Sequence, residues 1–267
     1  MFLSIDAIRG PVSSAGRRQC DLHPTPAVEH PTRDLSGGTA VNHRFIVISS
    51  LLCGFIWLGI HAVQDVSAHG ADTGAVEGSG QRRSDIRTLP AFTAIELRDA
   101  SDLELTIGPD TRVVVEADDN LLEQIRTEVD GNTLIISSEG RYHARRTPTL
   151  RVTVPTLEAL TVHGSGTARL HALDAGPLRL AIHGSGDIAA EGRADALTIL
   201  VNGSGDAALS ALVAQHVDAA INGSGDIAVD ARKSLAARIN GSGDIRYQGQ
   251  PAQLSKQVHG SGEIAAR

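Results

Sequence analysis

The sequence predicts an all-β fold, a parallel β-helix with coils of about 18–20 residues and an irregular N-terminal capping section. One observation is a Gly-Ser-Gly phrase that recurs between residues 160 and 267, with its first glycine at positions 164, 184, 203, 223, 241 and 260. Successive copies are therefore 20, 19, 20, 18 and 19 residues apart. The other is that apolar residues alternate with others around the phrase, as Leu178, Leu180 and Ile182 do. A period of two indicates strands, and a fixed short repeat indicates a stacked array.

Each repeat is expected to contain a strand, a glycine corner, a second strand and a loose return. The corner requires glycine because a sharp bend beside a neighbouring coil calls for positive φ and close backbone approach. Just before the corner, Asn202, Asn222 and Asn240 are predicted to form an amide ladder. The other three copies hold a histidine in that slot, namely His163, His183 and His259.

The corners are the candidate binding surface, because stacking would display their hydroxyl and carboxylate groups in columns about 4.7–4.9 Å apart per coil. The candidate residues are Ser165, Ser185, Asp187, Ser204, Asp206, Ser224, Asp226, Ser242, Asp244, Ser261 and Glu263. Two interpretations of the acids stay open. Calcium bound along the Asp ladder would relieve carboxylate repulsion; alternatively, each Asp caps its own corner and points to solvent. The sequence predicts no catalytic residue and no other metal site or cofactor.

The N-terminal third divides into three segments before the folded part begins. Residues 1–43 are polar and proline-containing, and they are predicted to be a disordered extension or, if Val41 rather than Met1 is the true start, a mis-annotated one. Residues 44–68 are predicted to be a signal peptide cleaved after Ala68, because an apolar run follows Arg44 and small residues end it. The alternative is an uncleaved membrane anchor through residues 45–63. Residues 69–87, with an out-of-phase Gly-Ser-Gly at 78–80, are predicted to be a linker.

Residues 88–159 are predicted to be the N-terminal capping coils, and residues 160–267 the repeat coils. Within the cap, the stretch Arg98–Asp102 falls where the glycine corner falls later, so it is interpreted as a worn copy of the corner. A helical turn is expected around residues 119–125. Asp130 and Gly131 between two alternating segments predict a hairpin.

Composition excludes several classes of function. A formal net charge of −7 argues against a nucleic-acid partner, which would require a basic surface. Cys20 and Cys53 lie before the predicted cleavage point, so the mature chain would form no disulfide. A polysaccharide-active enzyme needs a local cluster of acids, whereas the repeat places one acid on each coil. A non-enzymatic protein is therefore predicted.

The phrases Ile182-His-Gly-Ser-Gly-Asp-Ile188 and Ile239-Asn-Gly-Ser-Gly-Asp-Ile245 closely resemble the putative auto-transporter adhesin head GIN domain family of bacteria. The resemblance covers about residues 85–267. It implies a right-handed parallel β-helix without catalytic residues, and a role in adhesion through the repeated phrase. The expected function is an exported module of the periplasm or cell surface that binds glycans, other surface polymers or a second copy of itself. The alternative is an envelope spacer without a ligand.

Overall fold

In the computed structural model, residues 74–267 are described, and strands dominate this part of the chain. A single 3-10 turn, η1 (Asp119–Leu121), interrupts them in the described range, where a helical turn was predicted. The strands are β1 (Val76–Glu77), β2 (Arg82–Arg87), β3 (Ala94–Leu97), β4 (Asp102–Ile107), β5 (Arg112–Asp118), β6 (Ile125–Asp130), β7 (Thr133–Ser138), β8 (Tyr142–His143), β9 (Thr149–Val154), β10 (Ala159–Gly164), β11 (Thr167–Gly184), β12 (Asp187–Gly203), β13 (Ala207–Gly223), β14 (Ile227–Gly241), β15 (Ile245–Gln248), β16 (Gln253–Gly260) and β17 (Ile264–Ala266).

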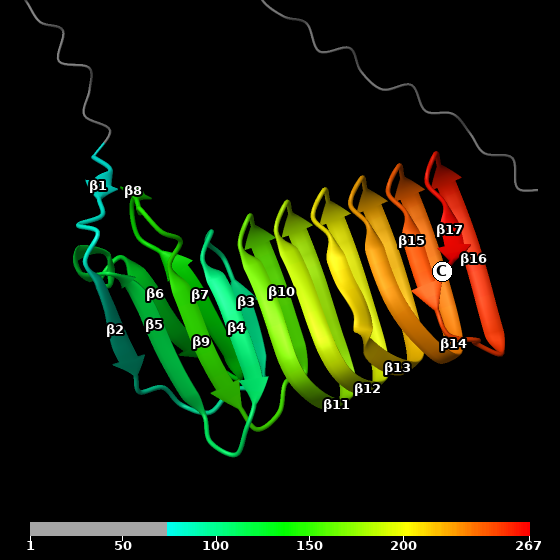
Figure 1. The fold of residues 1–267 in the computed structure, drawn as a ribbon, viewed down its shortest axis with the longest axis horizontal. Coiled ribbons are helices and arrows are strands. Elements are labelled where there is room, and N and C mark those ends of the chain that lie inside the picture. The colour runs from blue at the N-terminus through cyan, green and yellow to red at the C-terminus, as the bar shows by residue number, and fades with distance from the viewer. Residues whose placement is uncertain (1–73) are drawn as a thin grey trace, which may run out of the picture. The chain divides into compact units, whose positions relative to one another are not determined.

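The repeat strands stack in parallel, one coil upon the next, from β10 to β17 (Figure 1). Register aligns the first glycines of the corners with one another along the whole array. The glycines so aligned are Gly164, Gly184, Gly203, Gly223, Gly241 and Gly260. The prediction of a parallel β-helix with its corners in one column is confirmed.

The return between the two faces of a coil is not the loose segment that was predicted. β11 runs without a break from Thr167 to Gly184, and β12, β13 and β14 behave in the same way. Unequal coil lengths are absorbed by register shifts at this bend, the largest between Leu209 and Val213 of β13. The backbone groups of the return therefore find ladder partners in the adjacent coils instead of water.

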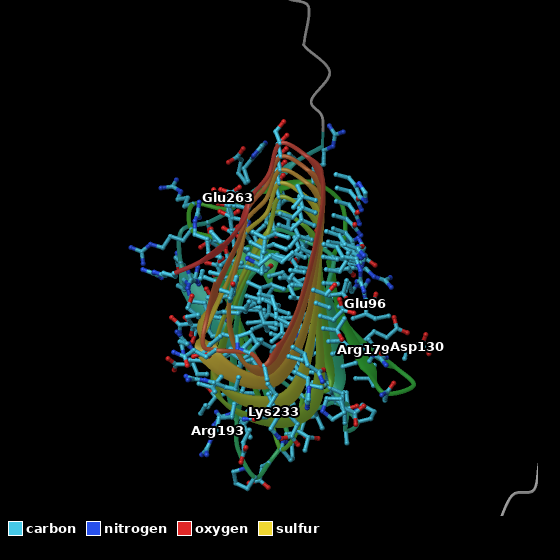
Figure 2. The ribbon with its side chains drawn as sticks, turned by 90° about the vertical axis from the view of Figure 1, so that its right-hand side faces the viewer. Glu96, Asp130, Arg179, Arg193, Lys233 and Glu263 are labelled. Carbon is cyan, nitrogen blue, oxygen red and sulfur yellow. The ribbon has the colours of Figure 1, made fainter. Side chains whose placement is uncertain are left out.

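The core lies between the two faces of each flattened coil (Figure 2). Inward residues repeat in columns, and one of these includes Ile182, Val201, Ile221 and Ile239, all buried. Every second residue of a strand therefore points into the coil and is apolar, as the period of two in the sequence predicts. The columns of the repeat coils hold no aromatic residue until Tyr247, which suits a thin coil.

An irregular section closes the N-terminal end. β6 and β7 form an antiparallel hairpin whose turn contains Gly131 at φ 61°, as predicted. β3 pairs with β10 and β4 with β11, so that Leu97 is opposite Val162 and Asp102 opposite Thr167. The residues between them occupy the position of the glycine corner, which confirms the interpretation of a worn copy.

The predicted linker at 69–87 is wrong for the residues described. β1 pairs with β8, and β2 pairs antiparallel with β5 along its whole length. Ser79 is also fixed, because its N–H donates to Asn120 Oδ1 at 2.9 Å and its hydroxyl donates to Asp119 Oδ1 at 2.5 Å. Residues 76–87 therefore belong to the cap, and the Gly-Ser-Gly at 78–80 is a bound turn of the cap.

The predictions for residues 1–43 and 44–68, including the start at Val41, the apolar run and both cysteines, lie outside the described residues. Between residues 74 and 267, no helix is long and apolar enough to cross a membrane.

Candidate functional site

The glycine corners form one edge of the solenoid, and their shape explains the sequence of the phrase. The first glycine has positive φ in every copy, from 95° at Gly164 to 147° at Gly223. A Cβ on Gly223 or on Gly225 would also stand against the carbonyl oxygen of the equivalent glycine one coil earlier. Only glycine accommodates both the backbone angle and this approach. The corner itself continues the ladder, since from Ser185 onward each serine N–H donates to the carbonyl oxygen of the first glycine one coil earlier, as Ser224 does to Gly203 at 2.8 Å.

The six serines between the glycines project from this edge. All six are exposed, and across residues 74–267 none of their hydroxyls makes a hydrogen bond within the chain. They are Ser165, Ser185, Ser204, Ser224, Ser242 and Ser261. Their backbones are held in register while their hydroxyls remain available to a ligand.

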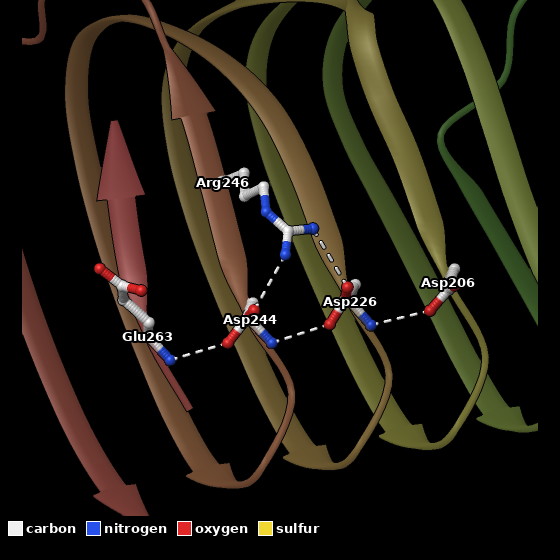
Figure 3. A network of polar contacts seen from close by, with 5 residues as sticks. All are labelled: Asp206, Asp226, Asp244, Arg246 and Glu263. Carbon is white, nitrogen blue, oxygen red and sulfur yellow. Dashed lines mark hydrogen bonds and ion pairs between the residues drawn. The ribbon is translucent and has the colours of Figure 1, made fainter. Parts of the chain in front are cut away.

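The acids after the corners form a ladder that joins neighbouring coils (Figure 3). One carboxylate oxygen of each acid accepts the backbone N–H of the acid in the next coil. The four bonds run from Asp206 to Asp187 at 3.0 Å, and from Asp226 to Asp206, Asp244 to Asp226 and Glu263 to Asp244 at 2.9 Å each. The interpretation that each Asp caps its own corner is therefore wrong: each caps the strand of the following coil.

Arg246 supplies a cation to the end of this ladder. Its Nη1 is 3.2 Å from Asp226 Oδ2 and its Nη2 is 2.9 Å from Asp244 Oδ2. One guanidinium thus offsets the repulsion between two stacked carboxylates. Sequence reasoning missed Arg246 because its approach to Asp226 depends on the register between β14 and β15. In the range 74–267, no group of three or more His, Cys, Asp or Glu residues could hold a metal ion.

The slot before the corner forms the amide ladder that was predicted. Asn222 donates to Asn202 Oδ1 at 2.7 Å, and Asn240 donates to Asn222 Oδ1 at 2.9 Å. Asn202 Nδ2 lies 3.1 Å from His183 Nδ1, and the His183 ring stacks on His163 with centroids 5.1 Å apart. Asparagine and histidine thus share this slot because both continue one polar column.

The worn corner differs from the six others because it carries a buried carboxylate. Asp99 takes the place of the first glycine and accepts hydrogen bonds from Ser101 N at 3.0 Å and Ser101 Oγ at 2.9 Å. Burial raises the pKa of Asp99 despite these bonds. The candidate surface therefore begins at Ser165, above a corner that lacks the exposed pattern.

Together these columns make a polar crest, the name used below for the six corner serines with the flanking acid and amide ladders. All eleven predicted site residues lie on it, in register. One oxygen of Asp187, Asp206, Asp226 and Asp244 is occupied in joining coils, whereas the serine hydroxyls are not. The crest is repetitive: every corner offers a serine hydroxyl, five of the six are followed by an acid and three are preceded by an asparagine, and no corner carries a special cluster.

Comparison with a solved structure supports the fold. The chain resembles a putative adhesin from Bacteroides fragilis, with a TM-score of 0.62 and 23% identity over 72% of this chain and 100% of that one. It also aligns with a putative lipid binding protein from Parabacteroides distasonis, with a TM-score of 0.48 and 24% identity over 72% of this chain and 99% of that one. No curated protein matches the sequence.

The comparison with protein families is more specific. Residues 91–251 match the family described as putative auto-transporter adhesin, head GIN domain. The match spans the cap from β3 onward and the coils up to the bend that precedes β16, which is more than half of the chain. The chain belongs to this family.

Proposed function

We propose that this protein is an exported, non-catalytic adhesin-like module that binds linear polymers, such as cell-surface or envelope glycans, along the polar crest. The observation that carries the proposal is the column of six exposed serine hydroxyls without hydrogen bonds inside the described chain. Each corner is a shallow site, but repetition lets one polymer contact several corners at once, and avidity then compensates for weak individual contacts. Membership of an adhesin family is consistent with this role.

The chemistry of the crest favours a neutral, hydroxyl-rich ligand over a charged one. The acid ladder gives the crest a negative border, although Arg246 offsets part of it near Asp226 and Asp244. A strongly anionic polymer would meet these carboxylates, whereas sugar hydroxyls can donate to carboxylate and amide oxygens and accept from serine. The net charge of −7 likewise opposes nucleic acid.

Binding of the protein to intact cells and to a glycan array tests the proposal. The triple variant Ser204→Ala, Ser224→Ala and Ser242→Ala removes three hydroxyls without touching the backbone ladder, and it should lose most of the binding. A matched control removes three hydroxyls that likewise make no hydrogen bond within residues 74–267, on the face formed by β10, β12 and β16, through Thr161→Ala, Thr198→Ala and Ser255→Ala, and it should bind as the wild type does. Equal binding by the two triple variants would contradict a role for the crest.

A structural spacer without a ligand is the second candidate, and the ladders favour it. The Asp and Asn side chains bond coil to coil, which stiffens the array whether or not anything binds. Absence of binding to any cell or glycan by the wild type would favour the spacer. Mass spectrometry of the N-terminus in cell fractions would test export, because cleavage after Ala68 is expected of an exported chain.

A further inference from the structure

In the last coil, the inward side chains of β16 are open to solvent. Leu254, Lys256 and Val258 of β16 follow three buried residues of β14 in register. Leu254 and Val258 nevertheless remain 45% and 41% exposed. The cause is that, in the described part of the chain, no strand pairs with β16 on the side away from β14.

Lys256 is a cation at the end of an aliphatic column. The column runs through Leu180, Ile199, Ala219 and Ala237 before it reaches Lys256. The lysine side chain lies across the open end of the coil, with its Nζ 3.0 Å from the carbonyl oxygen of Ile264 and 4.7 Å from the ring centroid of Tyr247. The ammonium therefore binds an outermost carbonyl and an aromatic face while it keeps access to water.

A second molecule stacked on this end would meet the cation. The free edge of β16 invites pairing with another strand, and Leu254 and Val258 would add apolar contact. A layer at strand spacing would, however, remove water from the Lys256 ammonium. Burial of a charge without an ionic partner opposes association strongly, and inward charged residues are one means by which sheet edges resist pairing.

We propose that this end of the solenoid is a latent self-association surface, and that Lys256 keeps it from stacking on a second copy of the chain. Once the cation is removed, the expected occupant is another molecule docked through β16 about a two-fold axis, because the same edge then serves both partners. The inference does not depend on the polar crest, since Lys256 lies in an inward column and not at a corner.

Sedimentation velocity on the full chain in detergent tests the proposal. Lys256→Val should add a species of twice the protein mass, with association at least about 100-fold tighter than in the wild type, or about 2.8 kcal/mol at 1.4 kcal/mol per factor of ten. Lys233→Val is the matched control, because it removes the other lysine, an exposed residue at the lower bend (Figure 2), and it should sediment as the wild type does. Adding Leu254→Glu to Lys256→Val should abolish the new species.

Lys256→Ala, which has a smaller side chain, should associate in the same way and guards against a local effect of valine. The proposal is overturned if both Lys256 variants keep the wild-type mass distribution with an unchanged strand signal in circular dichroism. Loss of that signal in both would also overturn it, since Lys256 would then hold the coil together. Persistence of the dimer after Leu254→Glu would do the same, because the contact would lie elsewhere.

Discussion

Four glycine-to-alanine substitutions separate the two physical demands of the corner. Gly223 has φ 147° and a close backbone neighbour in the coil before it, whereas Gly225 has only the close neighbour. Gly131, in the hairpin of the cap, has φ 61°, but a Cβ added there would have no heavy atom within 4 Å. Gly176 has neither constraint. The set thus contains each factor alone, both factors together, and neither.

The expected losses follow from these two factors. Positive φ costs an alanine about 1–2 kcal/mol, so Gly131→Ala should lose about that much. A methyl group forced against its neighbours costs about 1–3 kcal/mol. Gly225→Ala should lose about that much, because its new Cβ would press on the backbone carbonyl of Gly205, which cannot turn aside as a side chain can. Gly223→Ala combines both and should lose about 2–5 kcal/mol. Gly176→Ala should be neutral or more stable by up to about 1 kcal/mol, since alanine restricts the unfolded chain.

Urea unfolding followed by circular dichroism measures these differences as shifts of the transition midpoint at constant slope. The order of stability should be Gly176→Ala, then Gly131→Ala and Gly225→Ala, then Gly223→Ala. If Gly223→Ala loses no more than Gly131→Ala, the corners do not approach one another closely. The explanation of the repeated phrase given above would then be wrong.

Four further predictions concern the ladders and the cap. Asn222→Ala removes a donor and an acceptor from the amide ladder and should destabilise the chain by about 1–3 kcal/mol in urea unfolding, at about 0.5–1.5 kcal/mol per bond. Asp226→Asn keeps a side-chain oxygen that can accept the N–H of Asp244, whereas Asp226→Ala removes this acceptor. Asp226→Asn should therefore unfold at a higher urea concentration than Asp226→Ala. Calcium or a chelator should not change the Tm, because Arg246 already compensates two carboxylates; a rise of Tm with calcium would instead support the interpretation that calcium binds along the Asp ladder. Because burial raises the pKa of Asp99, the folded chain holds this proton more tightly, and stability is lost as pH rises through the raised pKa; Asp99→Asn should therefore gain more stability over the wild type at pH 7 than at about pH 4 in urea titrations.

The column of corners could be predicted because one short phrase marks every coil and fixes the register. The return could not, since residues at the lower bend share no phrase and differ in number from coil to coil, as Ser210 to Leu212 show. The alternation of apolar and other residues in the sequence predicts the strands on either side of the bend. It does not show that β11 to β14 each continue through the bend as one strand.

The candidate site was predictable in its membership but not in its bonding. All the corner serines and acids lie where periodicity placed them, yet the partner of each carboxylate is in the next coil. Local turn chemistry suggests a bond within the same corner, and only the stacking distance shows that the neighbouring strand is as near. Arg246 and Ser79 were missed because their partners are distant in sequence or depend on register.

Differences in coil length are confined to the bend opposite the crest, while glycine faces glycine at every level. Residues can therefore be added or removed near 210–212 without altering the spacing of the hydroxyls that a ligand would meet. Peptides could therefore be grafted at that bend while the opposite edge keeps one serine per coil at a regular spacing.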